Sequence, residues 1–153
     1  MEIVVGIGEA KVSRAGVLKT IGLGSCLGIA IYEMKLKAGA LAHAMLPKSN
    51  GLKSAKYVDS AIGISVEALE NLGGDRRNMV AKIAGGAQIF KHLTIENLKI
   101  GDRNLEVARD SLKELGIRII SEDTGGNVGR TLYFFVEDGR VLVKYSNGIE
   151  LWI

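Results

Sequence analysis

Glycine divides this chain into short apolar segments, and this pattern constrains the fold more than any other feature. The 153 residues include 20 glycines and one proline, so we expect many tight turns between short elements. Asp138-Gly139 and Asn147-Gly148 each separate two alternating apolar runs, which is a strong signal of a β-hairpin. The chain from residue 131 onward is therefore predicted to form a β-meander.

Apolar runs of strand length are spread along the rest of the chain. The strands that we expect are residues 2–8, 17–21, 27–33, 38–46, 79–84, 117–121, 131–137, 140–145 and 150–153. The third and fourth of these are expected to pair with each other through a turn at residues 34–37.

Two segments have the helical period instead. Residues 55–71 place Val58, Ile62, Val66 and Leu69 on one face before Gly73-Gly74, and residues 102–115 end at Gly116. Two helices among about nine mostly hairpin-linked strands predict an α+β fold with a mixed or antiparallel β core. We expect one domain over residues 1–153.

Composition excludes several functional classes. The net charge is +3, but the charges are interleaved and no basic run contains aromatic residues, so nucleic-acid binding is not expected. One cysteine and two separated histidines provide no zinc-type ligand spacing, and we expect no metal or cofactor. The chain has neither a signal-peptide pattern nor an apolar stretch of the ~18 residues that span a bilayer. We therefore expect a cytoplasmic protein without membrane insertion.

The single cysteine, Cys26, follows a glycine-rich turn, and His43 lies on the next apolar segment. A lone cysteine in an intracellular protein is most often a small buried apolar residue, and a histidine between two alanines is often a core residue. A thiol becomes a nucleophile, however, when a nearby base takes its proton. Antiparallel pairing of their two segments would bring Cys26 and His43 together.

Thr20, on the strand before this turn, and two residues of the turn itself could support a reaction at the thiol. The Thr20 hydroxyl or carbonyl could orient the imidazole, although a β-branched residue in a strand needs no such explanation. Backbone N–H groups near Gly24 and Ser25 could hold an oxyanion. Ser25 is a weaker nucleophile candidate because the Gly-x-Ser-x-Gly pattern is absent. Gly22-Leu23-Gly24 begins like the Gly-x-Gly-x-x-Gly motif of dinucleotide-binding proteins, but Leu27 stands where the third glycine is required. The other histidine, His92, is interpreted as structural.

Several motifs together are similar to the CheD family, the chemoreceptor glutamine deamidases of bacterial and archaeal chemotaxis. They are Thr20-x-Gly22-Leu23-Gly24-Ser25-Cys26, His43-x-Met45-Leu46-Pro47, Ala81-Lys82-Ile83-Ala84-Gly85-Gly86-Ala87, Ile100-Gly101-x-Arg103-Asn104 and Glu122-Asp123-Thr124-Gly125-Gly126-Asn127. They occur in the order of the family. The segment Gly6-Ile7-Gly8-Glu9 also resembles the family and is expected to approach the site.

The resemblance implies a cysteine hydrolase with a triad of Cys26, His43 and Thr20. It implies conversion of chemoreceptor glutamine side chains to glutamate with release of ammonia through a thioester, and a fold like the catalytic domain of the cytotoxic necrotizing factor toxins. It also implies a complex with the CheC phosphatase, so a binding regulator that stimulates CheC is the alternative function. Peptide hydrolysis or amide transfer by the same thiol stays chemically open.

Overall fold

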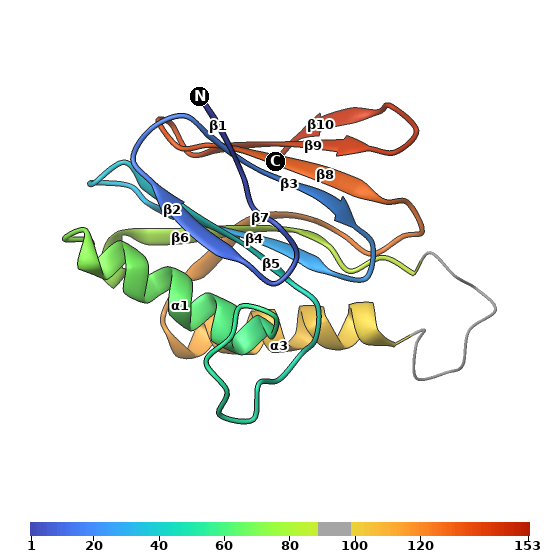
Figure 1. Cartoon of the computed structure of the whole chain (residues 1–153), viewed down its shortest axis with the longest axis horizontal. Helices are drawn as coiled ribbons and strands as arrows, with labels where there is room; N and C mark the ends of the chain where they lie inside the picture. The colour runs from blue at the N-terminus through green and yellow to red at the C-terminus, as the bar shows by residue number, and fades with distance from the viewer. Residues whose placement is uncertain (89–98) are drawn as a thin grey trace.

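The computed structural model describes residues 1–88 and 99–153, and these form two stacked five-stranded sheets with two helices (Figure 1). The outer sheet has the strand order β1-β3-β8-β9-β10, with β1 Glu2–Val4, β3 Val17–Leu23, β8 Arg130–Phe135, β9 Arg140–Tyr145 and β10 Glu150–Trp152. The central sheet has the order β2-β5-β4-β6-β7, with β2 Ala10–Ser13, β5 Ala38–Ala44, β4 Leu27–Glu33, β6 Met79–Gly85 and β7 Arg118–Thr124. The central sheet lies between the outer sheet and the helices.

Strand pairing is mixed, as expected. The β1–β3 and β6–β7 pairs are parallel, and the other pairs are antiparallel. The predicted β4–β5 hairpin and both hairpins of the meander are present. The α+β class with a mixed β core is therefore confirmed.

The N-terminal strand is the main difference from the sequence prediction. We expected one strand over residues 2–8, but β1 ends at Val4. Gly8 has a φ of 78°, a left-handed conformation that turns the chain out of the outer sheet. The chain then forms β2, which the sequence analysis missed, on the edge of the central sheet beside β5.

Two helices, α1 (Val58–Asn71) and α3 (Ile100–Glu114), cover the face of the central sheet that is turned away from the outer sheet (Figure 1). The face of α1 that the periodicity predicted is buried, including Val58, Ile62, Val66 and Leu69. Both helices differ from the predicted bounds only at their ends. No helix in the two described ranges is long and apolar enough to cross a membrane.

Two apolar clusters hold the three layers together. One lies between the helices and the central sheet and includes Ile29, Ile62 and Leu69. The other lies between the two sheets and includes Leu18, Leu132 and Phe134. Because β5 contributes to both, all seven of its residues are buried. This strand carries His43, so the histidine lies in the interior of the molecule.

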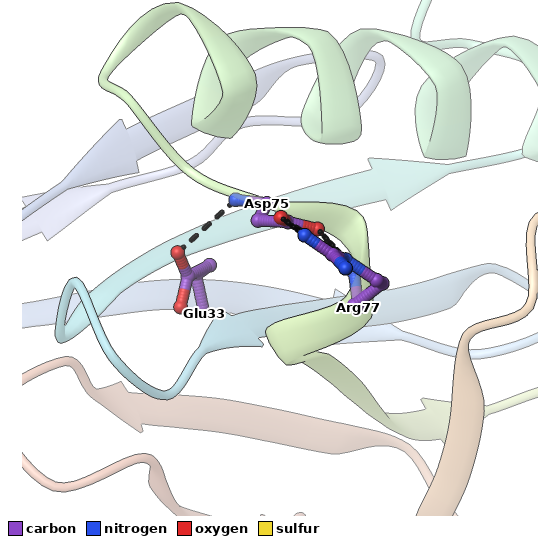
Figure 2. Close-up of polar contacts among 3 residues, drawn as sticks. All are labelled: Glu33, Asp75 and Arg77. Atoms are coloured by element: carbon purple, nitrogen blue, oxygen red, sulfur yellow. Dashed lines mark hydrogen bonds and ion pairs between the residues drawn. The ribbon is translucent and has the colours of Figure 1, made fainter.

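At the end of β4 that lies away from Cys26, the carboxylate of Glu33 fixes the surrounding loops. Its Oε1 accepts hydrogen bonds from the backbone N–H groups of Lys35 and Leu36 at 2.8 and 3.2 Å. Its Oε2 accepts one from Asp75 N at 3.2 Å, and the Asp75 side chain in turn pairs with Arg77 (Figure 2). The buried carboxylate thus joins the β4–β5 turn to η1 (Arg76–Asn78), the short 3₁₀ helix before β6.

Candidate active site

Thr20 and His43 meet between the two sheets, although 23 positions separate them in the sequence. Thr20 lies on β3 of the outer sheet, His43 lies on β5 of the central sheet, and both are fully buried. The distance from Thr20 Oγ1 to His43 Nδ1 is 2.8 Å. The Thr20 hydroxyl also donates a hydrogen bond of 2.7 Å to the carbonyl of Val5.

These two contacts determine which imidazole nitrogen carries the proton. The only hydroxyl proton of Thr20 is directed at the Val5 carbonyl, which can only accept. Thr20 Oγ1 must therefore accept a hydrogen bond from Nδ1–H of His43. The other nitrogen, Nε2, is then an unprotonated acceptor, which is the form that a general base requires. Nε2 is buried and has no hydrogen-bond partner among the described residues.

The strand register places Cys26 next to this histidine strand. β4 begins at Leu27, which pairs with Ala44, and Gly28 pairs with His43. Cys26 is the residue before β4, so the expected antiparallel arrangement of its strand and the histidine strand is confirmed. Cys26 is half-buried, and no hydrogen bond joins it to His43 Nε2 in the part of the chain that the structure describes.

Gly28 allows the outer sheet to approach His43. A Cβ atom at this position would lie 3.0 Å from side-chain atoms of both Leu132 and Leu23, and 3.5 Å from Thr20 Cγ2. The missing side chain therefore leaves room beside His43 for Thr20 and its apolar neighbours.

Every carbonyl of the segment Gly24-Ser25-Cys26, which we call the nucleophile turn, is held by a hydrogen bond. Gly24 O accepts from Ala87 N at 2.9 Å, and Cys26 O accepts from Gly86 N at 3.0 Å. Ser25 O accepts from Asn104 Nδ2 at 3.0 Å. The backbone N–H groups of the same three residues donate to no other described residue. Within the two described ranges, these three donors are therefore not committed to another acceptor.

Burial determines the protonation of Cys26 and His43. It raises the pKa of the Cys26 thiol, and the backbone N–H of Cys26 itself offsets only part of this increase. Burial also lowers the pKa of His43. Both groups are therefore neutral at pH 7, so the thiol would lose its proton to the imidazole only as it attacks a substrate.

The sequence analysis missed two groups that support this site. Asn104 was noted only as part of a motif, and the Val5 carbonyl was not considered. The segment Gly6-Ile7-Gly8-Glu9 approaches the site as expected, because Gly8 N donates to His43 O at 2.8 Å and His43 N donates to Glu9 O at 3.0 Å. The structural role expected for His92 lies outside the described residues. Among the residues described, no three His, Cys, Asp or Glu side chains form a metal-binding group.

Comparison with known proteins agrees with the motifs. A family model described as CheD chemotactic sensory transduction matches residues 45–145. The chain is 64% identical to the probable chemoreceptor glutamine deamidase CheD of Archaeoglobus fulgidus, over 99% of this chain and 98% of that protein. It is 49% identical to the protein of the same name from Moorella thermoacetica, over 94% and 90%, and 44% identical to that of Thermococcus kodakarensis, over 97% and 96%. The chain therefore belongs to the CheD family.

Proposed function

We propose that this protein is a chemoreceptor glutamine deamidase in which Cys26 is the nucleophile, His43 the general base and Thr20 the group that orients the base. The observation that supports these roles most directly is the hydrogen bond from His43 Nδ1 to Thr20, whose own proton goes to Val5. This chain of contacts leaves His43 Nε2 as a proton acceptor. The names of the related proteins support the substrate class.

The first half of the reaction forms a thioester. The Cys26 sulfur attacks the carboxamide carbon of a glutamine side chain while its proton passes to His43 Nε2. The carbonyl oxygen of the glutamine becomes negatively charged, and N–H groups of Gly24, Ser25 and Cys26 are the donors available to it. His43 then gives its proton to the nitrogen, and ammonia leaves.

The second half releases the product. A water molecule gives a proton to His43 Nε2 and attacks the thioester carbonyl. The tetrahedral intermediate expels the Cys26 sulfur, which takes back a proton from His43. One water is consumed, and the glutamine has become glutamate and ammonia. The enzyme returns to its starting state.

The setting of this reaction follows from the family. We infer that the chain acts as one domain, in the cytoplasm, on the cytoplasmic part of chemoreceptors. We also infer that its two-sheet core with helices on one side resembles the catalytic domain of the cytotoxic necrotizing factor toxins. Two stacked sheets with the thiol at the start of one strand are compatible with that resemblance.

Mass spectrometry of a cognate receptor cytoplasmic fragment tests the proposal. We expect glutamine-to-glutamate conversion and ammonia release with the wild type, and none with Cys26→Ala. The control variant is Glu150→Gln, because Glu150 is exposed at the edge of the outer sheet; it should match the wild type. Deamidation by a folded Cys26→Ala variant would refute the assignment.

The same experiment separates the alternative function. If the receptor fragment binds the wild type but no glutamine is converted, the main role is instead that of a binding regulator. In that case the partner to test is the CheC phosphatase, and the readout is its phosphatase activity with and without this chain.

A further inference from the structure

Asn104 joins three separate elements around the candidate active site. It lies near the beginning of α3 and is fully buried. Its Nδ2 atom donates to Ser25 O at 3.0 Å and to Met45 O at 3.1 Å. Ser25 precedes the nucleophile, and Met45 is the second residue after His43. One side-chain amide therefore contacts the backbone beside both candidate catalytic residues.

The bond to Ser25 O determines where the next N–H group points. The Ser25 carbonyl and the Cys26 N–H belong to the same peptide plane, and no peptide bond among the described residues is cis. In a trans peptide the C=O and N–H bonds point in opposite directions. When Asn104 holds the carbonyl on the helix side, the Cys26 N–H must point away from α3.

Among the described residues, Ser25 O is the one carbonyl of the nucleophile turn that accepts a hydrogen bond from a side chain. The carbonyls of Gly24 and Cys26 accept from backbone N–H groups of the segment after β6. Those bonds persist whatever the side chains are, whereas the bond to Ser25 depends on the identity of residue 104. The orientation of the Cys26 N–H is therefore sensitive to a single substitution.

The backbone of α3 is seated closely enough to hold the amide in place. A Cβ atom at Gly101 would lie 2.7 Å from Gly86 O, and a Cβ at Gly86 would lie 2.9 Å from the Leu105 side chain. The two glycines let the start of α3 lie directly against the segment after β6. Asn104, one turn along the helix, then reaches the nucleophile turn with a short side chain.

Asn104 interacts with its surroundings through its amide NH2 group and not through its Oδ1 atom. Oδ1 is buried and has no partner among the described residues, which is unfavourable for a polar atom. A leucine would fill a similar space without an unpaired acceptor. The amide has an advantage only through its two hydrogen bonds.

We propose that Asn104 is a positioning residue that aims the Cys26 N–H at the oxyanion formed during deamidation. The inference rests on the proposed function and deepens it, because it names the group that sets one oxyanion donor. Asn104 itself does not touch the substrate. Its effect should therefore be on the transition state rather than on substrate binding.

The test compares Asn104→Leu with the wild type on a receptor fragment. Removing one oxyanion donor lowers kcat by about 10²–10³-fold in other hydrolases, and misdirecting one should lower kcat by at least about tenfold with little change in KM. Asp102→Asn is the matched control on the exposed side of the same helix turn and should behave as wild type.

A second readout separates positioning from general damage. Alkylation of Cys26 by iodoacetamide needs the thiolate but no oxyanion donor. Its limiting rate, reached at a pH above the thiol pKa, should therefore stay close to the wild-type rate in Asn104→Leu. Equal loss of alkylation and deamidation would overturn the inference, because the whole turn would then be displaced. All variants are measured at a temperature at which circular dichroism shows them folded.

The two proposals can fail separately. If Cys26→Ala is inactive but Asn104→Leu keeps the wild-type kcat, the positioning role is wrong and the deamidase assignment stands. If Cys26→Ala still converts glutamine, both are wrong, because no oxyanion then forms beside Cys26.

Discussion

Thr20 shows how one hydroxyl group can fix the state of a buried histidine. It donates to the Val5 carbonyl and accepts from His43 Nδ1, and both bonds lie where no solvent competes. The Val5 N–H in turn donates to Lys19 O at 2.7 Å, so the acceptor is itself held beside β3. The orientation of the imidazole thus depends on the backbone contact between Val5, the residue after β1, and β3.

Substitution of Thr20 tests this arrangement. Thr20→Val keeps the shape but leaves His43 Nδ1 and the Val5 carbonyl without a partner, so the neutral imidazole can place its proton on the wrong nitrogen. We expect kcat to fall roughly 100-fold or more and the free energy of unfolding to fall by about 1–3 kcal/mol. Steady-state deamidation and urea unfolding measure the two effects.

Thr20→Ser is the matched variant because it keeps the hydroxyl. It should retain most of kcat while losing only the packing of one methyl group, about 1 kcal/mol. Full activity in Thr20→Val would contradict the orienting role.

The pH dependence of the reaction shows whether Cys26 and His43 are a neutral thiol and imidazole or a thiolate–imidazolium ion pair. Burial lowers the pKa of His43 below its usual 6.5 and raises that of the Cys26 thiol above its usual 9.0. In the proposed role of general base, His43 acts only when it is unprotonated, so kcat/KM should decline only below pH 6.5. Iodoacetamide alkylation of Cys26, which follows the thiolate, should still be rising above pH 9.0. Alkylation that is already maximal at pH 7 would instead indicate a thiolate–imidazolium pair.

At the scale of the elements, the ends of β6 and β4 meet at Gly85 and Cys26. Gly85 has a φ of 115° and a Cβ built there would overlap the Cys26 carbonyl oxygen. The carbonyl oxygen of Gly85 accepts hydrogen bonds from Gly125 N and from the guanidinium group of Arg130. Arg130 in turn forms an ion pair with Asp123. The nucleophile turn is therefore fixed by the chain that lies directly against it.

Gly85→Ala should displace this turn. We expect a loss of at least about 2 kcal/mol in unfolding free energy from backbone strain and loss of deamidation. Gly63→Ala is the matched control, since Gly63 lies inside α1 with open space around its Cβ position. It should leave activity unchanged and stabilise the protein by about 0.5–1 kcal/mol. Thermal unfolding and the receptor assay report both results, and an active Gly85→Ala variant would show that the turn tolerates displacement.

Local sequence patterns predicted the elements whose signals are local. The hairpins at Asp138-Gly139 and Asn147-Gly148 and the buried face of α1 follow from turn chemistry and helical period. β2 was missed because its four residues form a strand only through pairing with β5, about 30 positions later. Asn104 could not be interpreted for a similar reason, since its two acceptors lie 79 and 59 positions away.

At the scale of the whole molecule, the candidate site depends on how the two sheets are stacked. Thr20 belongs to the outer sheet, while Cys26 and His43 belong to the central one or adjoin it. Phe134 of β8 packs between the sheets, edge-on to Tyr32 and against Gly39 of β5. Contacts of this kind set the distance between the sheets, and so between Thr20 and His43.

Two core truncations distinguish the effect of sheet stacking on kcat from a general loss of stability. Phe134→Ala should lower the unfolding free energy by about 3–5 kcal/mol and Leu69→Ala, between α1 and the central sheet, by about 2–5 kcal/mol. Only Phe134→Ala loosens the contact between sheets, so only it should also lower kcat in the folded protein. Equal kcat values for the two folded variants would show that sheet stacking does not control the site.

The burial of β5 has a consequence for how the protein loses activity on heating. β5 has a neighbour on each edge and cluster residues on both faces, so its amide protons should exchange with solvent only when the whole molecule opens. His43 thus lies on the strand that we expect to unfold last. Displacement of His43 by heat should therefore coincide with global unfolding. If activity is lost at a lower temperature than the β5 amides exchange, the loss must begin elsewhere, at the nucleophile turn or at Thr20.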